Sequence, residues 1–102
     1  MKISIITASF NAAATIRDCL ESVKGQTHGD VEHIVVDGGS TDGTIEILKS
    51  NPQLRWISEA DTGQSHALNK GFAMARGEII GWLNADDTYT PGAVSTAVDC
   101  VE

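Results

Sequence analysis

Residues 33–48 read HIVVDGGSTDGTIEIL, an apolar run that passes through a glycine-rich turn into a second apolar stretch. The run before Asp37 is typical of a buried strand, and the stretch after the turn has the spacing of a short helix. Asp37 therefore stands at the carboxyl end of a strand, where open α/β sheets bind their ligands. Gly38 and Gly39 carry no side chains that would keep a ligand away from the backbone. We expect a ligand-binding turn here.

A purely structural interpretation of the same turn stays open. Ser40 or Thr41 would be the N-cap of the following helix, and Asp42 would interact favourably with the positive end of the helix dipole. In that interpretation the acids only stabilise a strand-to-helix connection.

The rest of the chain alternates strands with helices. Strands are predicted at 3–8, 31–36, 54–58 and 78–83, and helices at 13–24, 41–49 and 63–76, with a last helix opening at Pro91. The inward faces of the helices are predicted to carry Ile16, Cys19, Leu20 and Val23, then Ile45 and Leu48, then Leu68, Phe72 and Ala75. This alternation predicts a mainly parallel sheet with right-handed crossovers and helices on its faces. We expect one Rossmann-like, three-layer α/β/α domain over residues 1–102.

Charge limits the partners that this domain can have. The 102 residues include 14 acidic and 7 basic side chains, a formal net charge of -7. Nucleic-acid binding relies on clustered Lys and Arg, so we expect no nucleic-acid partner. A small phosphorylated ligand would need a divalent cation, because only Lys70 and Arg76 lie near the predicted site segments.

Neither the cysteines nor the amino-terminal apolar run predicts a special site: we expect no metal site at the cysteines and no membrane anchor at the amino terminus. Cys19 and Cys100 have no metal-type spacing, and we interpret both as structural. The apolar run at residues 3–6 is far too short for a signal peptide or a membrane span. We expect no membrane segment in this chain and a cytoplasmic location.

Polar groups follow three of the predicted strands. The first strand ends in Thr7-Ala8-Ser9-Phe10-Asn11, the second in Asp37-Gly38-Gly39-Ser40, and the fourth in Asn84-Ala85-Asp86-Asp87. The carboxyl ends of parallel strands share one edge, which holds the ligand crevice in this fold class. Three polar runs at one edge favour a binding site over a capped turn.

The third of these runs has the chemistry of a cation site. Asn84 and Asp86 are two residues apart, so in strand geometry they share a face. Oxygen ligands of this kind suit Mg²⁺ or Mn²⁺. The alternative is that Asp86 and Asp87 belong to a turn with capping acids before Pro91.

With these segments in place, the chain resembles the nucleotide-sugar-binding half of family 2 glycosyltransferases, which have the GT-A fold. Four runs carry the resemblance in the family's order: TASFNAAATIRDCLESVKGQ after the opening strand, VDGGSTDGT, DTGQSHALNKGFAMARGEIIGWLNADD, and the proline-led helix that follows. A dinucleotide-binding domain has little support, because no G-x-G-x-x-G follows the first strand.

The resemblance implies donor-binding roles. The loop that lies against the base and ribose is matched by Thr7, Ala8, Ser9 and Asn11. The turn whose acid recognises the base, usually uracil, is matched by Asp37, with Gly38, Gly39, Ser40 and Asp42. A segment beside the donor is matched by Asn69 and Lys70. Lys70 would offset diphosphate charge, and its alternative is a solvated lysine on a helix.

The resemblance also implies a metal-dependent reaction. Asn84-Ala85-Asp86 occupies the family's metal motif, usually Asp-x-Asp, with Asp86 or Asp87 as ligand to Mg²⁺ or Mn²⁺. The metal would neutralise the leaving nucleoside diphosphate. Asn84 departs from the usual aspartate, which leaves its role as a metal ligand, an outer-sphere group or a ribose contact open.

The implied activity is inverting transfer of a sugar from a nucleoside-diphosphate donor, most simply a UDP-sugar. No residue matches the family's general base or acceptor half, so we assign no catalytic residue and expect the chain to be the donor-binding half alone. The alternative is a non-catalytic nucleotide-binding or interaction module with the same fold. Ile79, Ile80 and Trp82 would leave an apolar edge on the fourth strand, and we expect self-association through it.

Overall fold

The computed structural model describes residues 2–26, 30–52, 54–59, 64–83 and 85. They form β1 (Ile3–Ser9), α1 (Ile16–Lys24), β2 (Val31–Asp37), α2 (Thr44–Lys49), β3 (Arg55–Ser58), α3 (Gln64–Met74) and β4 (Ile79–Trp82). Each predicted strand and helix in this part of the chain is present. The predicted helix at Pro91 lies outside the described residues.

The four strands form one sheet in the order β3-β2-β1-β4, and every neighbouring pair is parallel. At the centre, Ile6 of β1 pairs with Ile34 on one side and Trp82 on the other. The prediction of a parallel sheet is confirmed.

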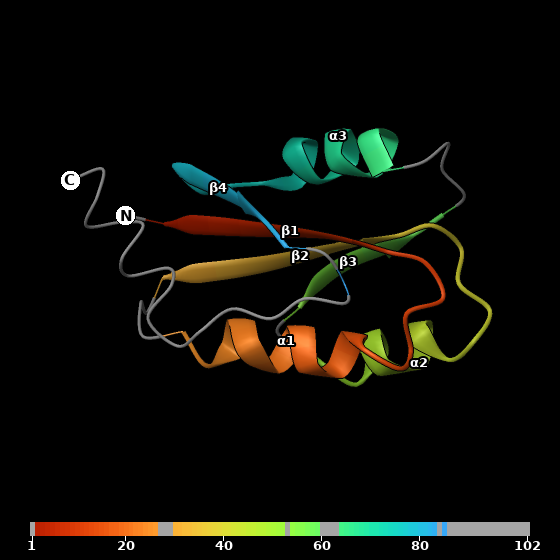
Figure 1. Cartoon of the computed structure of the whole chain (residues 1–102). Helices are drawn as coiled ribbons and strands as arrows, with labels where there is room; N and C mark the ends of the chain where they lie inside the picture. Colours follow the sequence, from red (N-terminus) through yellow and green to blue (C-terminus); the bar gives the residue numbers. More distant parts are fainter. Residues whose placement is uncertain (1, 27–29, 53, 60–63, 84, 86–102) are drawn as a thin grey trace.

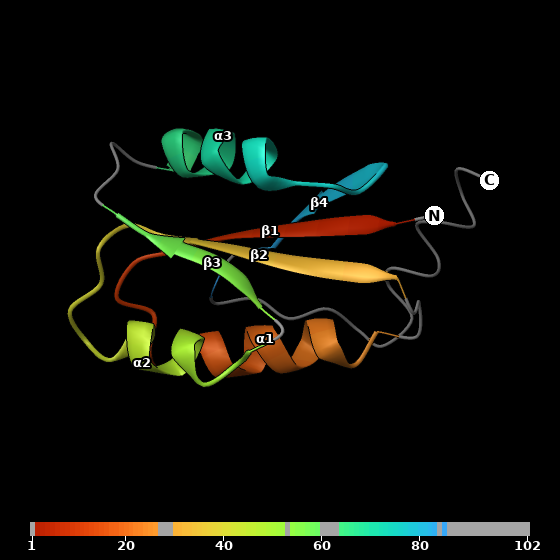
Figure 2. The ribbon, with the colours of Figure 1, turned by 180° about the vertical axis from the view of Figure 1, so that it is seen from behind.

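Helices cover both faces of this sheet, as Figures 1 and 2 show. Alternate residues of β1 point to opposite faces, so Ile3 and Ile5 join the core beneath α1 and α2. On the other face, Ile34 and Val36 of β2 pack against the end of α3 and the residue after it. The three-layer prediction is therefore confirmed.

A glycine lets α3 approach the sheet closely. A Cβ on Gly71 would overlap the side chain of Ile6 in β1. Successive helix positions are about 100° apart, so Phe72 turns away from the sheet and is 46% exposed. The expectation that Phe72 shares the inward face with Ala75 was wrong, because Gly71 occupies that face.

The first helix follows its predicted pattern, whereas α2 does not. Ile16, Cys19, Leu20 and Val23 of α1 are all buried. In α2 the buried residues are Thr44, Ile47 and Leu48, while Ile45 is only half-buried, contrary to prediction. The helix starts three residues later than predicted, because Gly43 has a φ of 108° and ends the turn in a left-handed conformation.

The proposed N-caps of α2 were also wrong. The N-cap is Gly43, which makes no side-chain capping bond, and neither Ser40 nor Thr41 occupies that position. Among the described residues, no helix has the length and apolar character needed to cross a membrane.

Candidate functional site

The carboxyl ends of the four parallel strands lie at one edge of the sheet, together with the loops that follow β1 and β2 (Figure 1). The chain crosses from β1 toward β2 on one face, and from β3 over to β4 on the opposite side of β1. This change of direction puts a topological switch point between β1 and β4. Open α/β sheets bind ligands in the crevice beside such a point.

Asp37 is the centre of a buried hydrogen-bond network at this edge. It is 0% exposed, and its Oδ1 accepts hydrogen bonds from Ser9 Oγ at 2.8 Å and Ser40 Oγ at 2.5 Å. Its Oδ2 accepts from the backbone N–H groups of Gly39 at 3.0 Å and Ser40 at 2.8 Å, and from Ser58 Oγ at 2.9 Å. Burial acts to raise the pKa of Asp37, but these donors outweigh it and hold the pKa below its usual value.

This network makes Asp37 a structural junction. A carboxylate offers roughly four lone-pair sites, and five donors from within the chain already occupy them. Ser9 ends β1 and Ser58 ends β3, so one carboxylate ties three neighbouring strand ends and the following turn together. A direct contact between Asp37 and a base would require one of these donors to leave.

Two hydrogen bonds of Asn11 also join the turn after Asp37 to the loop after β1, and we call these two joined loops the clasp. The backbone N–H of Asn11 donates to Ser40 Oγ, and Asn11 Oδ1 accepts from the N–H of Thr41, both at 2.8 Å. Asn11 has a φ of 49°, in the left-handed region that asparagine tolerates better than most residues. The asparagine therefore holds two loops that are about 30 residues apart in sequence.

Asp42 continues this clasp toward the helices. Its carboxylate accepts from the backbone N–H of Ala13 at 3.1 Å and from the N–H and hydroxyl of Thr44 at 3.1 and 2.6 Å. Thr44 Oγ1 in turn accepts from the N–H of Ala12 at 3.0 Å. The Thr44 hydroxyl is the main cause of the lowered pKa of Asp42. The structural interpretation of Asp42 is thus confirmed in part, since the acid satisfies the first turn of α2.

Phe10 was predicted to lie at this edge, in the run Thr7-Ala8-Ser9-Phe10-Asn11, but it was not assigned to the site. It lies between Ser9 and Asn11, both held by the network, and its side chain is 64% exposed. Single exposed apolar side chains are common on protein surfaces, so it is the position of Phe10 between two residues of the network that makes it a candidate ligand contact. The available signal was an aromatic residue in a loop that leaves a buried strand at its carboxyl end.

Two predicted residues of β1 lie behind the edge. Thr7 is 0% exposed, and its hydroxyl is 2.8 Å from His33 Nε2 and 3.8 Å from Cys19 Sγ. Ala8 is partly buried on the α3 face, against the cluster of Ile34 and Val36. Thr7 is therefore a core residue in this structure, and Ala8 is a packing residue at the end of the sheet.

On the α3 side, Lys70 forms an ion pair with Glu59, whose Oε1 lies 2.9 Å from Lys70 Nζ. The Lys70 side chain is only 15% exposed, so the alternative of a solvated lysine was wrong. Asn69 beside it is exposed. Arg76 was expected near the site but lies at the opposite edge, where its backbone N–H donates to Glu32 Oε2 at 2.7 Å.

The predicted metal ligands Asp86 and Asp87, with Asn84, lie outside the described residues. The described part of the chain holds no group of three or more His, Cys, Asp and Glu side chains that would bind a metal. Leu83 N–H donates to Ile6 O at 3.1 Å, so the β1–β4 pairing continues to the residue before Asn84. The carboxylate and amide oxygens that follow in sequence suit Mg²⁺ or Mn²⁺.

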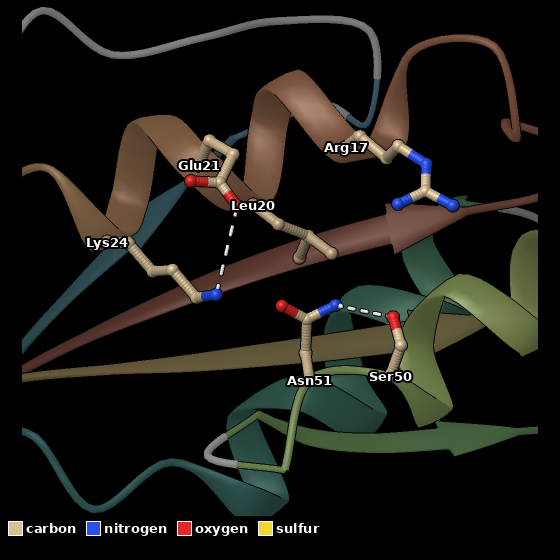
Figure 3. Close-up of a pocket in the computed structure, with 6 residues that line it drawn as sticks. All are labelled: Arg17, Leu20, Glu21, Lys24, Ser50 and Asn51. Carbon is tan, nitrogen blue, oxygen red and sulfur yellow. Dashed lines mark hydrogen bonds and ion pairs between the residues drawn. The ribbon is translucent and has the colours of Figure 1, made fainter.

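A hollow of about 310 Å³ lies on the helical face formed by α1 and the end of α2 (Figure 3). It is lined by Arg17, Leu20, Glu21, Lys24, Ser50 and Asn51. Within it, Lys24 pairs with Glu21 at 3.8 Å, and Asn51 Nδ2 donates to Ser50 Oγ at 3.3 Å. None of the predicted site residues lines it, so we do not assign the binding site here.

A parallel sheet with this strand order and a polar clasp beside its switch point defines the class of Rossmann-like nucleotide-binding domains. The sequence profile described as "Glycosyl transferase family 2" matches residues 4–102. The chain belongs to this family, and its fold is that of the GT-A glycosyltransferases.

Known relatives agree with this assignment. The chain is 37% identical over 101 residues to chondroitin synthase of Escherichia coli, covering 95% of this chain and 15% of that protein. It superposes with a TM-score of 0.89 on TarS 1-349 of S. aureus in complex with UDP-GlcNAc, at 25% identity, covering 99% of this chain and 31% of that one.

A second solved structure is the mannosyltransferase PcManGT of Pyrobaculum calidifontis in complex with GDP-Man and Mn²⁺. The TM-score is 0.86 at 29% identity, and the match covers 95% of this chain and 31% of that one. The chain therefore spans a third or less of each of these three relatives.

Proposed function

We propose that this chain is the donor-binding part of an inverting, metal-dependent glycosyltransferase that uses a nucleoside-diphosphate sugar, with a UDP-sugar as the first candidate. The observation that carries the proposal is the hydrogen-bonded pair of loops after β1 and β2. These loops lie at the carboxyl ends of the strands, beside the switch point between β1 and β4. Family membership supports it. So do the similar structures that bind UDP-GlcNAc and GDP-Man, which differ in their base.

In this proposal the nucleotide lies on the clasp, and the buried residues act from beneath it. Phe10 stacks on the base, a contact that every base can make through its π face. Asn11, Gly38 and Gly39 offer backbone carbonyl groups, and the two glycines leave clearance for the ribose and base. Asp37 keeps these groups in place through its five donors.

The other predicted residues either support the clasp from within the fold or lie exposed beside it. The supporting residues are Thr7, Ala8, Ser9 and Ser40. Asp42 and Asn69 are exposed beside the clasp, and in this proposal Lys70 lies near the diphosphate. The expected base contact of Asp37 is replaced in this proposal by a positioning role, because its carboxylate is 0% exposed and fully occupied.

The divalent cation would be held by Asp86 or Asp87, with Asn84 and Ala85 in the same segment. A bound Mg²⁺ or Mn²⁺ supplies neutralisation of the charge on the leaving nucleoside diphosphate. The chain's own charge makes such help necessary, because carboxylates outnumber basic groups 14 to 7. Lys70 is the basic residue of the described chain that we assign to the same role.

Calorimetric titration with UDP and UDP-sugars, with and without Mn²⁺, tests the proposal. We expect binding that strengthens with Mn²⁺ and that loses this strengthening in Asp86→Ala. Asp30→Ala is the matched control, since Asp30 pairs with Lys2 at the opposite edge. If neither uridine nor guanosine nucleotides bind, the proposal is wrong.

Inversion at the anomeric carbon and a cytoplasmic location also belong to this proposal. Sugar transfer would distinguish an enzyme from a non-catalytic nucleotide-binding module of the same fold. Self-association through β4 also belongs to the proposal, supported by Ile80, which is 41% exposed on that strand.

A further inference from the structure

Glu59 stands directly after β3 and is fixed to the network of Asp37 by its backbone. Its N–H donates to the carbonyl oxygen of Asp37 at 3.0 Å, and the preceding Ser58 donates to the Asp37 carboxylate at 2.9 Å. Its side chain is 58% exposed and pairs with Lys70 at 2.9 Å. One residue thus connects the turn after β2 with helix α3.

The position of Lys70 is unusual among the basic residues of the chain. All seven Lys and Arg residues belong to the described part, and five lie at or beside the amino ends of the strands: Lys2, Lys24, Lys49, Arg55 and Arg76. Arg17 is on α1, which covers the other face. Among the described residues, Lys70 is therefore the basic residue that lies on the α3 face away from the amino ends of the strands. Its ion pair with Glu59 sets where its ammonium group lies.

A second contact keeps α3 in register with β3. Arg55 Nη1 donates to the carbonyl oxygen of Met74 at 2.6 Å, at the last residue of α3. Arg55 begins β3 and Glu59 follows its end. The helix is thus attached to both ends of the same short strand, by Arg55 at one end and by Glu59 at the other.

From these contacts we infer that Glu59 is a positioning residue of the donor site, which holds Lys70 beside the carboxyl end of β3 so that its charge faces the diphosphate. This inference rests on the proposed function. It deepens that function by naming an acidic residue whose loss weakens the binding of an anionic ligand.

The direction of the effect makes the inference testable. By charge alone, removing a carboxylate near a diphosphate should strengthen binding. If Glu59 positions Lys70, then Glu59→Gln should instead weaken UDP binding, by roughly three- to tenfold for a partly exposed pair. Lys70→Met should weaken it at least as much, and Glu59→Gln/Lys70→Met should bind no more weakly than Lys70→Met alone.

The experiment is calorimetric titration of the chain with UDP and Mn²⁺, for the wild type, these variants and the control Asp30→Asn. Asp30→Asn makes the same charge change in the partner of Lys2 at the opposite edge and should leave affinity unchanged. Thermal unfolding should be almost unaltered in Glu59→Gln, and the dependence of affinity on salt should become shallower. A structural role alone would not change that salt dependence.

Three outcomes overturn the inference, and they can be distinguished. If the wild type binds UDP and Glu59→Gln binds equally or more tightly, Glu59 does not position Lys70, while the proposed function stands. If the wild type binds no nucleotide, both fail. Additive losses in the double variant would also contradict the inference, because the two residues would then act separately.

Discussion

Glu32 and Asp37 are two acids on the same strand, β2, and they organise opposite ends and opposite faces of the sheet. Glu32 points toward α3, where it accepts from Ser4 Oγ at 2.6 Å, Arg55 Nη1 at 2.7 Å and the backbone N–H of Arg76 at 2.7 Å. Asp37 points toward the other face and accepts only from hydroxyl and backbone donors.

The two acids differ in charge compensation and in location. Burial acts to raise the pKa of Glu32, but Ser4, the Arg76 N–H and Arg55 outweigh it and lower the pKa to about 2. The network of Glu32 includes a guanidinium group and lies at the amino edge of the sheet, where it attaches α3 to β2. The network of Asp37 lies at the carboxyl edge and contains no cation. We infer that the first serves stability alone, and that the second serves stability and binding together.

The largest expected effect comes from Asp37→Ala. It leaves five donors without their acceptor, so we expect the free energy of unfolding to fall by about 3 kcal/mol. UDP affinity should fall by roughly 100-fold, because the turn and the end of β3 lose their common anchor. Chemical denaturation and calorimetric titration measure the two effects. A variant that keeps its stability but loses UDP would show that Asp37 contacts the nucleotide directly.

Glu32→Gln tests the other half of the comparison. We expect a loss of about 2 kcal/mol in unfolding free energy, because the partly buried Arg55, 31% exposed, loses its carboxylate partner. UDP affinity should stay within about twofold of the wild type, since no contact of Glu32 reaches the carboxyl edge. A parallel loss of UDP binding, measured by the same titration, would mean that the two networks are coupled through β2.

His33 and Glu32 lose their contributions to folding stability over different pH ranges, so their effects can be measured separately. Burial lowers its pKa from 6.5 to about 4, so the folded chain favours the neutral ring. Its stabilising contribution is complete above pH 6.5 and is lost as the pH falls toward 4, by about 3 kcal/mol. The contribution of Glu32 is lost only below its ordinary pKa of 4.5, as the pH falls toward 2.

His33→Gln should therefore flatten the stability curve between pH 6.5 and 4 and leave the loss below pH 4.5 in place. Urea denaturation across this range measures both steps. An unchanged curve above pH 4.5 would show that His33 is readily protonated in the folded chain.

Phe10→Ala separates ligand contact from framework at the Asp37 end. We expect UDP affinity to fall by about 1 kcal/mol, roughly fivefold, through loss of base stacking. Stability should change by less than about 0.5 kcal/mol, because the ring is exposed. Phe72→Ala is the control, since Phe72 is an exposed aromatic residue on α3. Equal losses in both variants would remove Phe10 from the site.

The smallest effect is expected at β4, which neither network stabilises directly. Ile80→Ser should reduce self-association at high protein concentration, with almost no change in UDP affinity. Sedimentation of the wild type and the variant measures this. A monomeric wild type under these conditions would contradict the predicted self-association.

Local sequence patterns predicted the elements well and their starts less well. Alternation of apolar runs with helical spacing identified all the strands and helices of the described chain. The starts of α1 and α2 were predicted three residues too early, because Ala12 O accepts the N–H groups of Thr15 and Ile16 in a turn and Gly43 has a left-handed φ. Such turns depend on single backbone conformations that periodicity does not detect.

The edge of the sheet where the site residues meet was predicted from the sequence, but their hydrogen-bond partners were not. Sequence order put Asp37, Asn11 and Asp42 at one edge, and parallel pairing brings them together there. It did not indicate that donors from β1, from β3 and from the turn after β2 would saturate Asp37, nor that the hydroxyl of Thr7 would face His33. Phe10 and Glu59 were given no role from the sequence, because exposure and ion pairing depend on neighbours that are distant in sequence.

By itself, the sequence determined the alternation of strands and helices, the parallel sheet, the family, and the edge where polar groups gather. These follow from apolar periodicity and from motifs that are local in the chain. Only the tertiary structure decided what each polar group does. The partners of Asp37 in β1 and β3 are 28 and 21 residues away. A carboxylate becomes a junction, and not an open ligand contact, only when folding brings such donors within hydrogen-bond distance.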